Sequence, residues 1–102
     1  MIVLTRFRVT ADRTDDFLVR AEAAAAVLRA RPGLLSLDLA RNVDDPDLWT
    51  LTTRWADVGS YRRALSGLES KMVVVPMLSE AIDEPTAYED PAFVGDNVPR
   101  GE

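Results

Sequence analysis

The 102-residue chain contains no cysteine and no histidine. The absence of cysteine excludes disulfides, thiolate nucleophiles and zinc–thiolate sites. The absence of histidine removes the imidazole that binds metals and haem iron and that transfers protons near neutral pH. The commonest catalytic groups are therefore missing, and we expect neither a metal site nor a cofactor.

The chain also lacks long apolar runs and clusters of positive charge. No run reaches the roughly 18 apolar residues of a membrane-spanning helix. The net charge is −5, and basic residues are scattered singly apart from Arg62-Arg63. This pattern disfavours nucleic acid and anionic membranes as partners and leaves a small aromatic molecule open. Because residues 1–8 alternate like a strand and have no basic leader, we expect a cytoplasmic protein.

What is present is the composition of one ordinary globular domain, with 47% hydrophobic and 28% charged residues. Apolar periodicity predicts strands near 2–9, 34–42, 48–55 and 86–89 and helices near 14–30 and 57–67. A further short helical segment is expected at 71–81, although its β-branched run Val73-Val74-Val75 fits an extended segment equally well. Asp12 or Thr14 is expected to cap the first helix and Asp57 the second. This order predicts an α+β, ferredoxin-like split βαβ fold, a four-stranded antiparallel sheet with both helices on one face.

The predicted sheet has two unequal faces. Strict alternation turns Leu35, Leu37 and Leu39 toward the helices, and Leu68 joins the apolar stripe of the second helix. The opposite face still carries apolar residues, namely Ile2, Leu4, Leu34, Ala40 and Leu48. A second subunit is the natural cover for such a face, so we expect a homodimer whose sheets pack face to face.

Taken in order, several segments resemble an antibiotic biosynthesis monooxygenase domain over about residues 1–90. They are Arg31-Pro32-Gly33-Leu34-Leu35, the turn at Asp44-Asp45-Pro46, residues 49–55, Val58-Gly59-Ser60-Tyr61 with the residues to Leu65, and residues 83–89. The resemblance implies a dimeric α/β barrel with a pocket in each subunit between the sheet and its helices. The family includes cofactor-free oxygenases of polycyclic phenols as well as haem-degrading enzymes.

The residues that serve the haem-degrading branch are not kept here. By alignment its asparagine, tryptophan and histidine ligand fall near Phe7, Ala64 and Val74. We therefore do not expect a haem-degrading enzyme. The phenol oxygenases use asparagine, tryptophan, tyrosine and arginine around an aromatic substrate, and residue types of this kind are present.

Asn42 and Arg54 are the candidate catalytic residues, because amide and guanidinium donors stabilise a developing oxyanion. The alternative for Arg54 is an ion pair with Asp38 on the neighbouring strand. Both candidates are expected on the face of the sheet away from the helices, whereas the tryptophans are expected on the face toward them. The four residues can share a pocket only if a bulge or a twist of the strand turns a side chain to the other face.

Four aromatic residues are candidates for binding a planar substrate. They are Trp49, Trp55, Tyr61 and Tyr88. Tryptophans on the apolar face of a strand are more often core residues than ligand contacts, and a tyrosine often caps a core with its hydroxyl in water.

The sequence thus predicts a cofactor-independent monooxygenase acting on an aromatic polyketide-like or quinol substrate. Two alternatives stay open, a non-catalytic ligand-binding or dimerisation module of the same fold and a polyketide cyclase-like protein. Residues 91–102 are rich in proline, glycine, aspartate and asparagine, and we expect a tail that is flexible or docked on the partner subunit.

Overall fold

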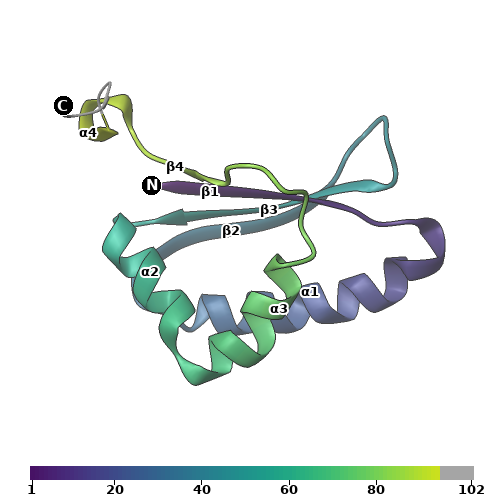
Figure 1. Ribbon diagram of the computed structural model, residues 1–102, viewed down its shortest axis with the longest axis horizontal. Helices are drawn as coiled ribbons and strands as arrows, with labels where there is room; N and C mark the ends of the chain where they lie inside the picture. Colours follow the sequence, from purple (N-terminus) through teal and green to yellow (C-terminus); the bar gives the residue numbers. More distant parts are fainter. Residues whose placement is uncertain (95–102) are drawn as a thin grey trace.

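The computed structural model describes residues 1–94 and contains one sheet with helices on one side of it (Figure 1). The elements are β1 (Ile2–Arg8), a 3₁₀ turn η1 (Ala11–Arg13), α1 (Thr14–Arg29), β2 (Leu34–Arg41), β3 (Leu48–Trp55), α2 (Val58–Ser66), a π-helical turn η2 (Ser70–Val74), α3 (Val75–Leu78), β4 (Ala87–Tyr88) and α4 (Pro91–Val94). The strand order is β2-β3-β1-β4, and every neighbouring pair is antiparallel. The predicted α+β ferredoxin-like fold is confirmed.

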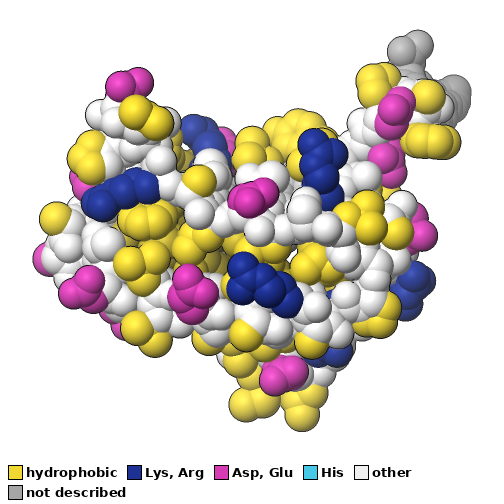
Figure 2. Space-filling model, turned by 180° about the vertical axis from the view of Figure 1, so that it is seen from behind, with side chains coloured by type: hydrophobic (Ala, Val, Ile, Leu, Met, Phe, Trp, Pro, Cys, Tyr) yellow, Lys and Arg dark blue, Asp and Glu magenta, His cyan; other side chains and the backbone are white. Residues whose placement is uncertain are grey.

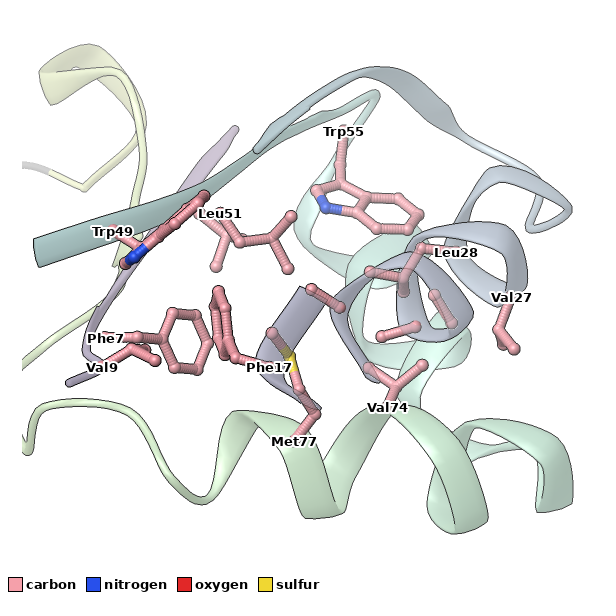
Figure 3. Packing of buried hydrophobic residues seen from close by; sticks show 14 residues of the cluster. Phe7, Val9, Phe17, Val27, Leu28, Trp49, Leu51, Trp55, Val74 and Met77 are labelled. Atoms are coloured by element: carbon pink, nitrogen blue, oxygen red, sulfur yellow. The ribbon is translucent and has the colours of Figure 1, made fainter. Parts of the chain in front are cut away.

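The core lies between the sheet and α1, where alternate residues of β1 and β3 are buried. Figure 3 shows Trp49 and Trp55 projecting from β3 toward the helices. The Phe17 ring of α1 lies 5.2 Å from the Phe7 ring and 5.5 Å from the Trp49 ring, so the aromatic residues of three elements form one cluster. The small side chains of α1 that are buried, Ala21, Ala24 and Ala25, allow this helix to lie close to the sheet.

The predicted alternation of β2 is wrong at its start. The pairing of β2 with β3 shifts between Leu34 and Ser36, which is a β-bulge. Leu34 therefore lies opposite Trp55 and packs against the core, whereas Leu35 is the extra residue and is 68% exposed. Beyond the bulge, Leu37 and Leu39 face the helices as predicted. Strict period-two reading fails here because one added residue reverses the direction of every side chain before it.

The two helix starts differ in how they are capped. Asp57 caps α2 as predicted, since its carboxylate accepts a hydrogen bond of 2.7 Å from the backbone N–H of Ser60. The predicted side-chain cap of α1 is wrong, because the structure has no such hydrogen bond at that helix start. Instead Asp12 accepts from the Thr10 hydroxyl, and the Thr14 hydroxyl donates to the Thr10 carbonyl.

The chain is helical from residue 68 to residue 78, after a bend at Gly67 where α2 has ended. The predicted helical segment at 71–81 is therefore present, but it begins and ends three residues earlier. Leu68 lies directly after this bend, at the start of the next helical turns, and is 75% exposed, so its predicted place in the apolar stripe of α2 is wrong. Val74 and Met77 of the following turns are buried against α1. Pro76 lies in the first turn of α3, directly after the π-helical turn η2.

No helix covers the second face of the sheet within residues 1–94 (Figure 1). Ile2, Leu4 and Leu48 lie on this face, as the register of β1 and β3 requires. The homodimer stays a prediction, and so does the boundary between a domain at 1–90 and a tail. Residues 95–102 of that tail lie outside the described residues. No helix in residues 1–94 has both the length and the apolar character that crossing a membrane requires.

Candidate functional site

A cavity of about 380 Å³ lies between the sheet and the helices, next to β1 and the segment that leads to β4. It is lined by Thr5, Tyr61, Leu78, Ser79, Ala81, Ile82, Asp83, Glu84 and Thr86. The walls thus come from β1, from α2, from the end of α3 and from the segment that connects α3 to β4. This volume is in the range of pockets that hold small organic ligands.

Tyr61 is the aromatic residue of this cavity, and α2 positions it. Asp57 fixes the start of α2, and the Tyr61 ring packs 5.9 Å from the Trp55 ring, which is buried in the core. Partial burial raises the pKa of the Tyr61 phenol. The phenol is therefore protonated at neutral pH and available as a hydrogen-bond donor, since no hydrogen bond within residues 1–94 involves its oxygen.

An ion pair fixes the segment that closes the cavity on the side of β4. The guanidinium of Arg6 donates two hydrogen bonds of 2.7 Å to the carboxylate of Glu84. These bonds hold the pKa of Glu84 below its ordinary value. Two backbone hydrogen bonds, Ile82 N–H to the Arg6 carbonyl at 2.9 Å and Leu4 N–H to the Thr86 carbonyl at 2.8 Å, bind the same segment to the edge of β1.

Asp83 is the second carboxylate that lines the cavity. Unlike Glu84, it forms no ion pair and accepts no side-chain hydrogen bond from the described part of the chain. An exposed carboxylate without a cation beside it can accept a proton from a bound acid. Residues 1–94 hold no group of three acidic side chains placed to bind a metal ion.

The two tryptophans predicted to bind substrate are core residues in the structure, with Trp49 7% and Trp55 1% exposed. The Trp55 indole N–H donates to the Thr53 hydroxyl at 2.8 Å, whereas the buried Trp49 N–H has no partner among the described residues. The guanidinium of Arg41 lies 4.9 Å from the centre of the Trp49 ring. Neither tryptophan lines the cavity; Trp55 supports the Tyr61 ring from behind, whereas Trp49 packs against Phe17 in the core.

Asn42 and Arg54, the predicted catalytic pair, are not brought together. Asn42 follows β2 in the hairpin, and its side-chain oxygen accepts hydrogen bonds of 2.8 Å from the N–H groups of Asp44 and Asp45. Arg54 lies near the other end of β3, about 20 Å away at roughly 3.3 Å per residue. Arg54 is opposite Ser36, and the alternative ion pair with Asp38 is not formed.

Tyr88 lies on β4, is 51% exposed and donates a hydrogen bond of 3.3 Å to the Pro85 carbonyl. It does not line the cavity of 380 Å³, but with Tyr61 it lines a smaller neighbouring cavity. Of the predicted site residues, the structure therefore places Tyr61 and Tyr88 together at this smaller cavity, and Arg54 and Tyr88 together at a separate cavity of about 350 Å³.

Sequence reasoning missed Thr5, Asp83 and Glu84 as residues of the site. One signal for Thr5 was present, since it is a polar residue on the otherwise apolar face of the first strand. The carboxylates carried no such signal, because a loop between a helix and a strand is ordinarily acidic and the long-range contact of Glu84 with Arg6 has no local pattern.

The model of the family described as "Antibiotic biosynthesis monooxygenase" matches residues 1–73 of this sequence. The chain belongs to the antibiotic biosynthesis monooxygenase family. A comparison with curated protein sequences finds no significant match.

Several solved structures share this fold. A conserved protein from Methanosarcina mazei Go1 is 20% identical with a TM-score of 0.70, and the match covers 84% of each chain. SnoaB from Streptomyces nogalater, described as a cofactor-independent oxygenase, is 22% identical with a TM-score of 0.68, and the match covers 78% of this chain and 80% of SnoaB. At these identities the likeness establishes the fold alone.

The sequence does not predict a haem-degrading enzyme, and this expectation is based on three positions. Phe7, Ala64 and Val74 are all buried in the core. Their side chains belong to the hydrophobic cluster between the sheet and the helices, so each has a packing role.

Proposed function

We propose that this member of the antibiotic biosynthesis monooxygenase family is a cofactor-independent monooxygenase acting on an aromatic polyketide-like or quinol substrate. The observation that carries the proposal is the cavity of about 380 Å³ between the sheet and the helices, with the free hydroxyl of Tyr61 on its wall. The likeness to SnoaB, a cofactor-independent oxygenase, supports the same reaction class.

The chemistry demands little of the protein. A phenol or anthrone loses a proton to a base, and the resulting anion passes one electron to O₂. The two radicals combine to a peroxide anion, which takes the proton back from the base to become a hydroperoxide. The hydroperoxide then loses water and leaves a new carbonyl. One oxygen atom is then in the product and the other is in water, together with the two hydrogens that the oxidised carbon has lost.

Three side chains have suitable positions for these steps. Asp83 accepts the proton, and the hydroxyls of Tyr61 and Thr5 donate hydrogen bonds to the developing oxyanion. One well-placed donor to an oxyanion is worth roughly 10²–10³-fold in kcat. Because the pKa of Tyr61 is raised, its phenol keeps its proton while the substrate loses one.

Oxygen consumption with anthrones and hydroquinones tests the proposal. We expect uptake by the wild type, and a fall in kcat of at least about 10-fold for Tyr61→Phe, since this change removes only the donor. Tyr88→Phe is the matched control, because the Tyr88 hydroxyl is bonded to Pro85 outside this cavity. No uptake across a broad panel would overturn the proposal.

The same assay tests the catalytic roles predicted from the sequence for Asn42 and Arg54. If Asn42 or Arg54 has a catalytic role, its substitution by alanine lowers turnover. Unchanged turnover would show that the substituted residue has no such role.

A non-catalytic ligand-binding module is the second candidate, and it is favoured by the small number of catalytic groups in the cavity wall. Arg6 neutralises Glu84, so Asp83 is the one unpaired carboxylate among the described residues of that wall. Tight binding of an anthraquinone without any oxygen uptake would support this module, and a polyketide cyclase-like protein would instead convert a linear polyketide without consuming oxygen.

A further inference from the structure

A second cavity of about 200 Å³ shares Tyr61 with the first as a lining residue. It is lined by Met1, Val58, Tyr61, Arg62, Ala87, Tyr88, Glu89 and Val94. These residues come from the start of β1, from α2, and from the β4–α4 arm. Figure 1 shows that this arm leaves the sheet beside the N-terminus and above α2.

The walls of this second cavity are mainly apolar, and both tyrosines of the predicted site contribute to them. Its volume is below the roughly 300–1,000 Å³ of pockets for drug-sized ligands. On one side it adjoins a wider hollow of about 750 Å³, which shares Met1, Val58, Glu89 and Val94 with it. In the part that the two tyrosines line, a ligand with one or two aromatic rings fits the size and the lining.

Arg62 is the cationic side chain in this wall, and it forms no ion pair with any described residue. The next residue shows the contrast, because Arg63 lies 4.0 Å from the Asp57 carboxylate. The acid in the wall, Glu89, lies 3.6 Å from the terminal ammonium of Met1 and accepts the N–H of Asp90. Glu89 is thus compensated, and Arg62 leaves the cavity with one positive charge.

Figure 2 shows one face of the molecule, on which basic and acidic side chains are interspersed among apolar areas without a continuous basic patch. A polyanion therefore finds little to bind there. A single guanidinium beside apolar walls instead matches one carboxylate on an apolar body, since the guanidinium fork fits a carboxylate with two parallel hydrogen bonds.

We propose that this second cavity binds a one- or two-ring aromatic monocarboxylate, with its carboxylate on Arg62 and its rings against Tyr61 and Tyr88. The site is distinct from the cavity proposed for oxygenation. Its ligand does not have to be oxidised, so this binding does not depend on the proposed activity.

Calorimetric titration of the full chain with 1-naphthoate tests the site, and 1-naphthalenemethanol serves as the uncharged analogue. We expect naphthoate to bind with one site per chain and more tightly than the alcohol. Arg62→Met keeps the apolar stem and removes the charge, so it should weaken naphthoate by at least about 10-fold and leave the alcohol unchanged. Arg63→Met, one residue away and already paired with Asp57, should change neither.

Tyr88→Ala tests where the ligand binds, because loss of this ring should weaken the binding of the acid and of the alcohol alike. Three results would overturn the proposal: equal affinity for acid and alcohol, equal effects of the two arginine substitutions, or no binding of naphthoate. Since none of these measurements involves oxygen uptake, failure of this site and failure of the proposed oxygenase are separate results.

Discussion

Glu84 shows how a single ion pair joins the open face of the sheet to the candidate site. Its partner Arg6 lies on the face of β1 that no helix covers, yet Glu84 lines the cavity between sheet and helices. The pair therefore spans the edge of β1 and holds the connection between α3 and β4 against it. Residue-scale prediction from sequence identified both charges but not this partnership, because the residues are 78 positions apart.

The hydrogen bonds from Arg6 lower the pKa of Glu84 in the folded state. A carboxyl group whose pKa is lower in the folded state than in the unfolded state stabilises the fold at pH values above the unfolded pKa, which is near 4.3 for glutamate. This stabilisation is lost as the pH falls through the folded pKa. We therefore expect Glu84→Gln to lower the free energy of unfolding in urea at pH 6.5, with the difference from wild type shrinking at pH 3.5. Glu22→Gln, on the exposed side of α1, is the control and should show no such pH-dependent difference. A constant difference for Glu84→Gln at both pH values would contradict the pairing.

At the scale of elements, the turn between α1 and β2 determines how closely α2 approaches the sheet. Gly33 has a φ of 91°, and its carbonyl accepts a hydrogen bond of 2.8 Å from the Ala56 N–H. A Cβ at this position would lie 2.5 Å from the Cβ of Ser60 on α2. Glycine is therefore required here for two reasons, namely the positive φ angle and the close contact with α2.

We expect Gly33→Ala to lower the free energy of unfolding by about 1–3 kcal/mol, because an αL backbone and a steric clash are added together. Gly59→Ala is the matched control on α2, since its Cβ would meet the flexible guanidinium of Arg63 at 3.0 Å and the Asp57 carboxylate at 3.4 Å, an ordinary contact distance. This control should be neutral or stabilise by up to about 1 kcal/mol, as alanine favours helix. Chemical denaturation measures both, and equal effects would show that the turn does not constrain α2.

At the scale of the whole molecule, the uncovered face of the sheet is the main feature that one chain leaves unexplained (Figure 1). Ile2, Leu4 and Leu48 lie among polar residues on it. We expect a homodimer to cover this face, since standard interfaces bury roughly 800 Å² per partner.

Light scattering after gel filtration should give twice the mass of the 11.3 kDa chain at micromolar concentration. Leu4→Lys introduces a charge near the middle of the face and should shift the protein toward the monomer, because an unpaired buried charge is costly. Val19→Lys, on an exposed position of α1, should leave the mass unchanged. A monomeric wild type would remove the face-to-face dimer.

The sequence by itself determined the family, the α+β fold, the inward alternation of β1 and β3 and the cap of α2 by Asp57. These features depend on local periodicity and on contacts between residues a few positions apart, which a sequence displays directly. It also singled out Tyr61 and Tyr88.

Only the tertiary structure decided which residues meet. It placed Leu35 outside through a bulge, turned Trp49 and Trp55 into core, and separated Asn42 from Arg54 along the length of a strand. It joined Arg6 to Glu84 and set Arg62 beside two tyrosines. These arrangements depend on strand register and on contacts between distant segments, for which neither composition nor periodicity carries a signal.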